Sequence, residues 1–273
     1  MIDTHCHIDD PAYTADLEAV LARQREAGVS AILVPATDAA SCDSVLSVCR
    51  SHPDYLYPAL GLHPENVDAN YQAALDTIRA IVYDPKVRPE LIAIGEIGLD
   101  YHFSSEFAAE QQDALRQQLH WALDLDLPVM LHLRDATEDS IRLLHEVNQV
   151  AIARSGKPLR AVAHCFSGSY ETALAYLREG FYLGIGGVIT FRNCRLADTL
   201  CNPEHRIPIE RLVLETDAPY MTPVPYRGQP NESRYMSYVV DRLAAAYGVP
   251  QETIIQATTA NAIRLFGRKI EKK

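Results

Sequence analysis

The chain has 273 residues, of which 48% are hydrophobic, and its formal net charge is −11 at pH 7. This length is normal for one α/β barrel, which needs about 250 residues, and the composition is that of a globular protein with a full core. No apolar run of about 18 residues occurs, which excludes a membrane-spanning helix. The acidic balance argues against wrapping of a long DNA duplex, because proteins that do so usually present a basic face.

The first residues and the cysteines indicate the cellular compartment in which the protein is expected. The chain begins Met1-Ile2-Asp3 and continues with polar residues, whereas a secretory signal peptide needs a basic start and then an apolar run. The six cysteines contain no C-x-x-C pair, and they are expected as reduced thiols rather than disulfides. We therefore expect a cytoplasmic protein without membrane contact, and no obligate protein partner is indicated.

Short apolar runs alternate with longer segments of helical periodicity along the chain. The apolar runs predict eight strands, at residues 1–7, 31–35, 56–62, 91–95, 129–132, 161–165, 182–185 and 212–215. Amphipathic segments predict helices, among them residues 16–27, 111–125, 137–150, 170–179, 232–247 and 251–266. Strands that alternate with helices in this way are typical of parallel βαβ units.

The alternation predicts an α/β protein with a single domain over residues 1–273, a (β/α)8 TIM barrel. A doubly wound open sheet is the alternative architecture. Its dinucleotide-binding version is excluded, because no G-x-G-x-x-G follows the first strand and the glycines at Gly184, Gly186 and Gly187 come too late. The active site of a barrel lies at the C-terminal ends of its strands, so those positions decide the chemistry.

Histidines and acidic residues stand at six of the predicted strand ends. They are His5 and His7, His63, Glu96 with Asp100, His132, His164, and Glu215 with Asp217. A buried charge or imidazole at a strand end is costly unless it is paired or bound to a metal. Imidazole and carboxylate groups suit divalent ions, and in a barrel these ends converge on one mouth. The sequence therefore predicts a metal site there.

The candidate ligands divide into two sets that share Glu96. One metal would be held by His5, His7, Glu96 and Asp217, and the second by Glu96, His132 and His164. A pair of metals bridged by a carboxylate is the usual hydrolytic arrangement, in which one ion activates a water and the other polarises a phosphoryl oxygen. Asp217 is the first choice for the general base, and Glu96 is a catalytic residue as the bridge.

Three more residues lie at the same mouth. His63 and Arg134 are expected to bind a phosphate oxygen, and His63 is also a candidate for assisting the leaving group. The alternatives are a satisfied strand-end histidine for His63 and an ion pair with Asp135 or Glu138 for Arg134. Glu215 is expected to orient a histidine or to serve as a further ligand.

Other histidines and cysteines are given no role. His52, His102, His120, His145 and His205 lie away from the strand ends, although His102 follows the fourth strand closely, and they are interpreted as structural or solvated. Cys6 and Cys165 are neighbours of candidate ligands but should point the other way along their strands, so neither is proposed as a nucleophile.

The strand-end segments together resemble the TatD family of metal-dependent deoxyribonucleases. The segments are DTHCHID (residues 3–9), GLHP (61–64), GEIGLDY (95–101), HCFSG (164–168) and ETDAPY (215–220). Residues 258–266 are similar to the ending of that family, so the resemblance runs from residue 1 to about residue 267. One departure is Tyr101-His102-Phe103, where many relatives have a second aromatic residue after the tyrosine; it concerns the substrate lip, not the metal site.

The resemblance implies a TIM barrel of the amidohydrolase-like group and a hydrolase of phosphodiester bonds. It implies a metal-dependent DNase, often a 3′→5′ exonuclease, with DNA ends or single-stranded DNA as the partner. Mg²⁺ or Mn²⁺ is the expected cofactor, two ions per chain, with Zn²⁺ as an alternative. By motif, the implied ligands are His5, His7, Glu96, His132, His164 and Asp217.

Two other functions remain open at this point. An amidohydrolase acting on an ester or amide, including an aminoacyl-tRNA ester, often bridges its metals with a modified lysine after the fourth strand, whereas this chain has Glu96 there. A metal-binding partner protein without catalysis would be expected to have lost a ligand, and none of the six positions is missing.

Overall fold

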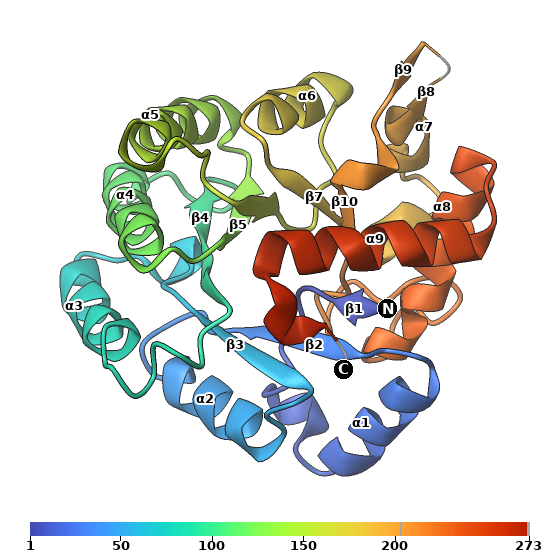
Figure 1. Ribbon diagram of the computed structural model, residues 1–273, viewed down its shortest axis with the longest axis horizontal. Helices are drawn as coiled ribbons and strands as arrows, with labels where there is room; N and C mark the ends of the chain where they lie inside the picture. The colour runs from blue at the N-terminus through green and yellow to red at the C-terminus, as the bar shows by residue number, and fades with distance from the viewer. Residues whose placement is uncertain (203, 272–273) are drawn as a thin grey trace.

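The computed structural model describes residues 1–202 and 204–271 (Figure 1). Eight parallel strands form one sheet in the order β1-β2-β3-β4-β5-β6-β7-β10. They are β1 (Ile2–Asp3), β2 (Ala31–Pro35), β3 (Leu56–Leu60), β4 (Ala93–Asp100), β5 (Val129–Arg134), β6 (Ala161–Ala163), β7 (Tyr182–Ile185) and β10 (Leu212–Leu214). The strand order follows the chain without a crossover, which is the order of a TIM barrel and confirms the predicted fold.

The barrel is closed between its first and last strands by separate hydrogen bonds rather than a continuous ladder. The backbone N–H of Thr4 donates to Leu214 O at 3.0 Å, and the N–H of His7 donates to Ala218 O at 2.8 Å. Strand β1 is therefore shorter than the predicted strand at 1–7, since after Asp3 the chain contacts the segment beyond β10 only at single positions. This seam carries His5 and Asp217 on its two sides.

Nine α-helices occur in the described residues, and those numbered α1 to α6 follow the strands around the barrel (Figure 1). The helices are α1 (Leu17–Glu26), α2 (Ser41–Ser51), α3 (Tyr71–Val82), α4 (Ala108–Leu125), α5 (Thr137–Ser155), α6 (Tyr170–Arg178), α7 (Leu196–Leu200), α8 (Met236–Tyr247) and α9 (Gln251–Phe266). Helix α8 starts four residues later than predicted, because Ser233–Tyr235 forms a separate 3-10 turn, η5. None of the helices in the described part of the chain is long and apolar enough to span a membrane.

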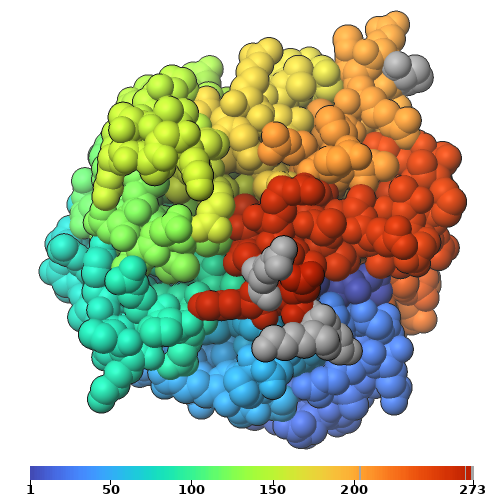
Figure 2. All heavy atoms as spheres, in the orientation of Figure 1, coloured from blue at the N-terminus to red at the C-terminus, as the bar shows by residue number. Residues whose placement is uncertain are grey.

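The core has two layers. The larger cluster lies between the strands and the surrounding helices. The smaller cluster takes buried side chains from every strand of the barrel, from the residue before β4, from the last helix and from the 3-10 turn η6 after it: Ile2, Ala31, Leu33, Ala59, Ile92, Ala93, Met130, Val162, Tyr182, Val213, Ala262, Leu265, Phe266 and Ile270. Helix α9 crosses the end of the barrel in Figure 1 and covers the middle of the same face in Figure 2. The interior is therefore sealed by α9 at the N-terminal ends of the strands.

Strand β4 is the element that extends furthest beyond its prediction. It runs from Ala93 to Asp100 rather than over 91–95, because it pairs with β5 as far as Arg134. The register shifts between Ile94 and Ile97, a local irregularity of the kind that re-aims side chains at barrel rims. Gly98 is required here, since a Cβ would lie 1.7 Å from the carbonyl oxygen of His132.

A short antiparallel hairpin was not expected from the sequence. Its strands are β8 (Cys201–Asn202) and β9 (His205–Arg206), and it lies between α7 and β10, outside the barrel (Figure 1). None of the described residues of the hairpin lines the cavity at the mouth of the barrel.

Candidate metal centre

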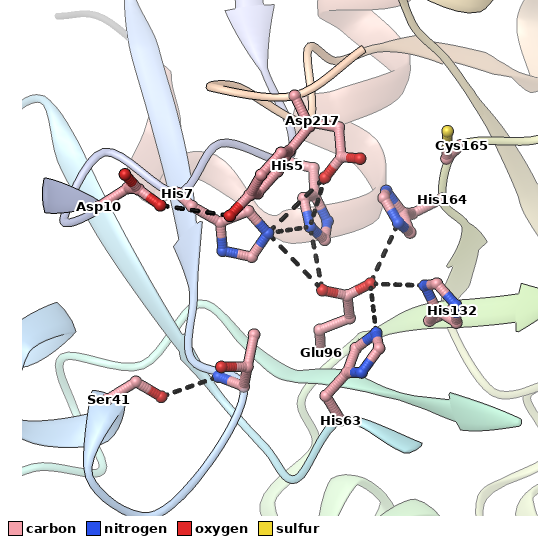
Figure 3. A network of polar contacts seen from close by, with 12 residues as sticks. His5, His7, Asp10, Ser41, His63, Glu96, His132, His164, Cys165 and Asp217 are labelled. Atoms are coloured by element: carbon pink, nitrogen blue, oxygen red, sulfur yellow. Dashed lines mark hydrogen bonds and ion pairs between the residues drawn. The ribbon is translucent and has the colours of Figure 1, made fainter. Parts of the chain in front are cut away.

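The six predicted ligands converge in one cavity at the C-terminal ends of the strands. They are His5, His7, Glu96, His132, His164 and Asp217 (Figure 3). The cavity has a volume of ≈ 840 Å³, and all of them except the fully buried His5 line it. The ligands come from β4, β5 and the segments just after β1, β6 and β10, so each depends on the barrel for its place.

Glu96 lies at the centre of the cluster and is only 2% exposed. Its Oε2 atom is 3.3 Å from His5 Nε2 and 3.8 Å from His7 Nε2. Its Oε1 atom is 3.1 Å from His132 Nδ1 and 3.0 Å from His164 Nε2. Figure 3 shows the carboxylate between these two groups of rings. One carboxylate therefore faces two separate sets of imidazole nitrogens through its two oxygens.

Asp217 completes the set on the Oε2 side of Glu96. Its Oδ1 atom is 3.7 Å from His5 Nε2 and 3.6 Å from His7 Nε2, and these two ring nitrogens are 3.3 Å apart. Asp217 has a φ of 58°, a left-handed conformation that costs energy for a residue other than glycine and is found preferentially at functional sites. The fold thus holds Asp217 in an unfavourable backbone conformation that presents its carboxylate to the cavity.

The charges of the cluster follow from burial and from the neighbouring side chains. Burial alone would raise the pKa of Glu96, but the surrounding histidines, first His5 and then His164, hold it well below its usual value. Burial would also raise the pKa of Asp217, but the hydrogen bond from His7 and the charges of His164, His5 and His7 together lower it. Burial, and then the charge of His164, lower the pKa of His5, which favours the neutral form of its ring. Both carboxylates are ionised at neutral pH.

His132 is held from both sides of its ring. Nδ1 faces Glu96, while Nε2 is hydrogen-bonded to Asp100 Oδ2 at 2.7 Å. Burial lowers the pKa of His132, but the hydrogen bonds to Asp100 and then Glu96 raise it to about 9. Asp100 was recognised only as a strand-end acid, without a role, and its four-residue spacing from Glu96 on an extended β4 is the signal that would have found it.

His63 lies at the edge of the cluster, with Nε2 3.5 Å from Glu96 Oε1. Its Nδ1 atom accepts a hydrogen bond from the backbone N–H of Glu65 at 3.1 Å, as the N-cap of the turn η2 (Pro64–Asn66). Since Nδ1 is an acceptor, the proton of the neutral ring is on Nε2. His63 therefore presents a hydrogen-bond donor to the cavity, not a ligand lone pair.

Arg134 ends β5 and lines the cavity. Its Nη2 atom is 2.8 Å from Asp100 Oδ2 and 2.7 Å from Glu65 Oε1, so the alternative of a pair with Asp135 or Glu138 is wrong. Asp135 is bonded to His102 Nδ1 at 2.7 Å instead. The guanidinium is held by the carboxylates of Asp100 at the end of β4 and Glu65 in η2, which fix its position at the mouth.

Glu215 is buried beside His164. Its Oε1 atom lies 3.5 Å from His164 Nδ1 and accepts a hydrogen bond from the backbone N–H of Cys165. Burial lowers the pKa of His164, but Glu96 and then Glu215 raise it well above its usual value. The geometry agrees with an orienting carboxylate, since Glu215 contacts the ring nitrogen that faces away from Glu96.

The cysteines next to the ligands are not nucleophiles. The thiol of Cys165 points away from Glu96 in Figure 3, and burial raises its pKa well above the usual range. Cys6 is fully buried in the core, and burial raises its pKa in the same way. Both thiols stay protonated at neutral pH, so neither supplies the thiolate that a cysteine nucleophile requires.

Asp3 is a second buried carboxylate that sequence reasoning missed. It accepts hydrogen bonds from Thr216 Oγ1 at 2.7 Å and Ser233 Oγ at 2.6 Å, and from the backbone N–H groups of Thr216 and His5 at 3.0 and 3.2 Å. Asp3 therefore ties the segment after β1, which carries His5, to the segment after β10. Its place at the start of the DTHCHID segment was visible, but Thr216 and Ser233, which bond to its carboxylate, are more than 200 residues away.

The donor set fits divalent cations. Three overlapping groups of side chains have ligand atoms within 4.8 Å of one another: His5, His164 and Asp217; His5, His7 and Glu96; His63, Glu96 and His132. Imidazole nitrogens facing ionised carboxylates in a buried cavity are the donors that Zn²⁺ and Mn²⁺ accept. His63 is the weakest member of these groups, because its Nε2 carries the proton.

A TIM barrel with such a donor set at its mouth defines a metal-dependent hydrolase. Comparison with known proteins agrees: the family model described as TatD related DNase matches residues 2–267. The chain therefore belongs to the TatD family.

Individual relatives match along almost the whole chain. The metal-dependent hydrolase YabD of Bacillus subtilis is 35% identical over 266 residues, which cover 97% of this chain and 98% of that protein. A protein of Erwinia tasmaniensis named 3′-5′ ssDNA/RNA exonuclease TatD is 33% identical, with 97% of this chain and 99% of that protein covered. The crystal structure of the TatD homologue YjjV from Escherichia coli superposes with a TM-score of 0.86 at 35% identity, over 97% of both chains.

Proposed function

We propose that this hydrolase is a deoxyribonuclease that cleaves phosphodiester bonds at a two-metal site, as a 3′→5′ exonuclease on single-stranded DNA. The observation that carries the proposal is Glu96, whose Oε2 faces His5 and whose Oε1 faces His132. A bridging carboxylate between two donor sets is the arrangement of two-metal phosphodiester hydrolysis. The nuclease name of the Erwinia relative supports the choice of substrate.

The metal sites follow from the two faces of Glu96. We assign one divalent cation to His5, His7, Glu96 and Asp217, and a second to Glu96, His132 and His164. Mg²⁺ or Mn²⁺ is the proposed cofactor, with Zn²⁺ as the alternative that the nitrogen donors favour. Such ions, when bound, make a water molecule more acidic and polarise a phosphoryl oxygen.

The protein's own groups would handle the proton and the substrate. Asp217 is ionised, borders the cavity and is the proposed general base, accepting the proton of the attacking water at its carboxylate. His63 would donate its Nε2–H to a phosphate oxygen or to the leaving oxygen. Arg134, braced by Asp100 and Glu65, would bind a second phosphate oxygen through its remaining N–H groups.

The test is cleavage of an end-labelled single-stranded DNA by chelator-stripped protein to which Mn²⁺ or Mg²⁺ is added back. We expect metal-dependent shortening from the 3′ end, with Asp217→Asn slower by about 10²-fold or more. Asp43→Asn, an exposed aspartate on α2, is the matched control and should behave as the unmodified protein. If metal binds and the DNA stays intact, the nuclease assignment fails and esters or amides become the candidate substrates.

A further inference from the structure

Exposed apolar side chains gather beside the cavity. Six large hydrophobic residues are exposed in the described part of the chain, and three of them lie in the loop after β10. Tyr220 is 55% exposed, Met221 42% and Val224 43%. Tyr220 and Met221 also line the cavity that contains Asp217. Exposed apolar side chains add little to the stability of the fold, and a group of them beside a site indicates a surface for a ligand.

The loop that carries these residues is held firmly. The side-chain amide of the buried Asn231 donates to the carbonyl oxygens of Tyr220 at 2.8 Å and Thr216 at 2.9 Å. The backbone N–H of Val224 donates to Thr190 Oγ1 at 2.9 Å, which joins this loop to the one after β7. A surface that is ordered in advance loses less conformational entropy when it binds, so the loop is suited to recognition.

Three arginines without a carboxylate partner among the described residues lie in the segments after β7 and β10. Arg192 and Arg195 follow η3 (Gly187–Thr190), the turn after β7 that contributes Val188 to the cavity. Arg227 belongs to the loop after β10, and its guanidinium lies 3.9 Å from the ring centroid of Phe191. All three are exposed, and none forms an ion pair within the described residues. In a chain of net charge −11, this is a local concentration of uncompensated positive charge.

An apolar, partly aromatic surface next to unpaired arginines matches single-stranded nucleic acid. Bases stack on aromatic rings or on guanidinium planes, and backbone phosphates pair with cations. A duplex would hide the faces of its bases. The three unpaired arginines and the exposed ring of Tyr220 therefore favour a single strand.

We propose that the loops after β7 and β10 form a strand-binding rim for the nucleotides on the 5′ side of the scissile phosphate. In this rim Tyr220, Met221 and Val224 contact bases, and the three arginines contact phosphates: Arg192, Arg195 and Arg227. The inference rests on the proposed nuclease function and deepens it, since it explains how an acidic protein holds a polyanion. It also predicts that strand binding and phosphodiester hydrolysis are separable.

The test compares the unmodified protein with a triple variant, Arg192→Gln, Arg195→Gln and Arg227→Gln. Binding of a fluorescently labelled single-stranded DNA is measured by anisotropy with the metals chelated, so that no cleavage occurs. We expect the affinity to fall at least about tenfold and the dependence on salt to become shallower by about two ions, as expected when three phosphate contacts are lost. Hydrolysis of bis(p-nitrophenyl) phosphate, a diester without a strand, should be unchanged in the metal-loaded protein.

Two sets of control variants sharpen the result. Arg88→Gln, Lys157→Gln and Arg178→Gln remove the same charge from exposed positions before β4, before β6 and at the end of α6, and should bind DNA as the unmodified protein does. Tyr220→Ala should weaken binding about tenfold, while Tyr220→Phe, which keeps the ring and loses only the hydrogen bond to Asp10, should not.

The outcomes separate this inference from the proposed function. The proposal of a strand-binding rim is wrong if the two triple variants bind DNA with equal affinity, or if the unmodified protein does not bind DNA. If DNA binding depends on the three arginines but no metal-dependent cleavage occurs, the strand-binding rim is supported and the nuclease assignment is wrong.

Discussion

The Nε2 atom of His132 lies 2.7 Å from Asp100 Oδ2, on the side of the ring opposite Glu96. Asp100 is in turn paired with Arg134 at 2.8 Å. A carboxylate in this place fixes which ring nitrogen carries the proton, and it leaves Nδ1 of His132 to face Glu96. Asp100 is thus a positioning residue whose effect would pass through His132.

Replacement of Asp100 tests this relationship. Asp100→Asn is expected to lower the affinity for Mn²⁺ about 10- to 100-fold, the usual effect of removing a carboxylate behind a metal-bound histidine. Isothermal titration calorimetry measures the loss without requiring activity. Asp135→Asn is the matched control, because Asp135 pairs with the exposed His102 rather than with a candidate ligand. Equal affinities in the two variants would remove Asp100 from the metal site.

The pH dependence of metal binding follows from His132. In the metal-free protein its pKa of about 9 means that the ring holds a proton at neutral pH, which a cation must displace. Proton release on binding therefore makes the affinity rise as the pH increases from about 7 to 9. Titrations in two buffers of different ionisation enthalpy count the released protons between about pH 7 and 9. An affinity that does not change over this interval would contradict the assignment of His132 as a ligand.

Gly98 gives a prediction about the contact between β4 and β5. A Cβ at this position would lie 1.7 Å from His132 O, so Gly98→Ala must push the two strands apart. We expect a destabilisation of at least about 1–3 kcal/mol, together with weaker metal binding because His132 moves. Gly186→Ala is the control, since its nearest neighbour would be at an ordinary 3.5 Å. Thermal unfolding of both variants gives the comparison.

The last helix can be tested separately from the site. Leu265 is 1% exposed in the inner cluster, and Leu265→Ala should destabilise the fold by about 2–5 kcal/mol. The affinity of the remaining folded protein for Mn²⁺ should not change, because Leu265 lies at the opposite end of the barrel from the cavity. Glu252→Ala, at an exposed position on the same helix, should leave both quantities unchanged. Urea unfolding and calorimetry provide the two measurements.

Much of the fold and of the candidate site could be predicted because both depend on local patterns. Buried parallel strands are continuous apolar runs, and an acid or imidazole at the end of such a run stands out, as His164 and Asp217 do. Convergence of the strand ends then follows from the barrel itself. For these residues the step from sequence to site required no knowledge of side-chain contacts.

The remaining features depend on contacts between distant segments. An ion pair with Asp135 or Glu138 was the alternative for Arg134, but its strand places it beside Asp100 at the end of β4 and Glu65 in the turn η2 after β3. The length of β4 was underestimated, because glycines at 95 and 98 interrupt the apolar run, although both are needed for close packing against β5. Such pairings between distant segments cannot be inferred from the spacing of residues in a single sequence.

The position of α9 has a consequence for synthesis of the protein. Because Leu265 and Phe266 complete the inner cluster, the eight strands cannot bury their interior until the segment at 251–270 has left the ribosome. Until then a nascent chain that already carries every candidate ligand would leave the N-terminal end of the inner cluster exposed to water. Ribosome-bound chains ending at residue 250 should accordingly be digested by protease at strand positions that the finished protein protects. The cavity at one end of the barrel is thus expected to form only after the last helix has packed against the other end.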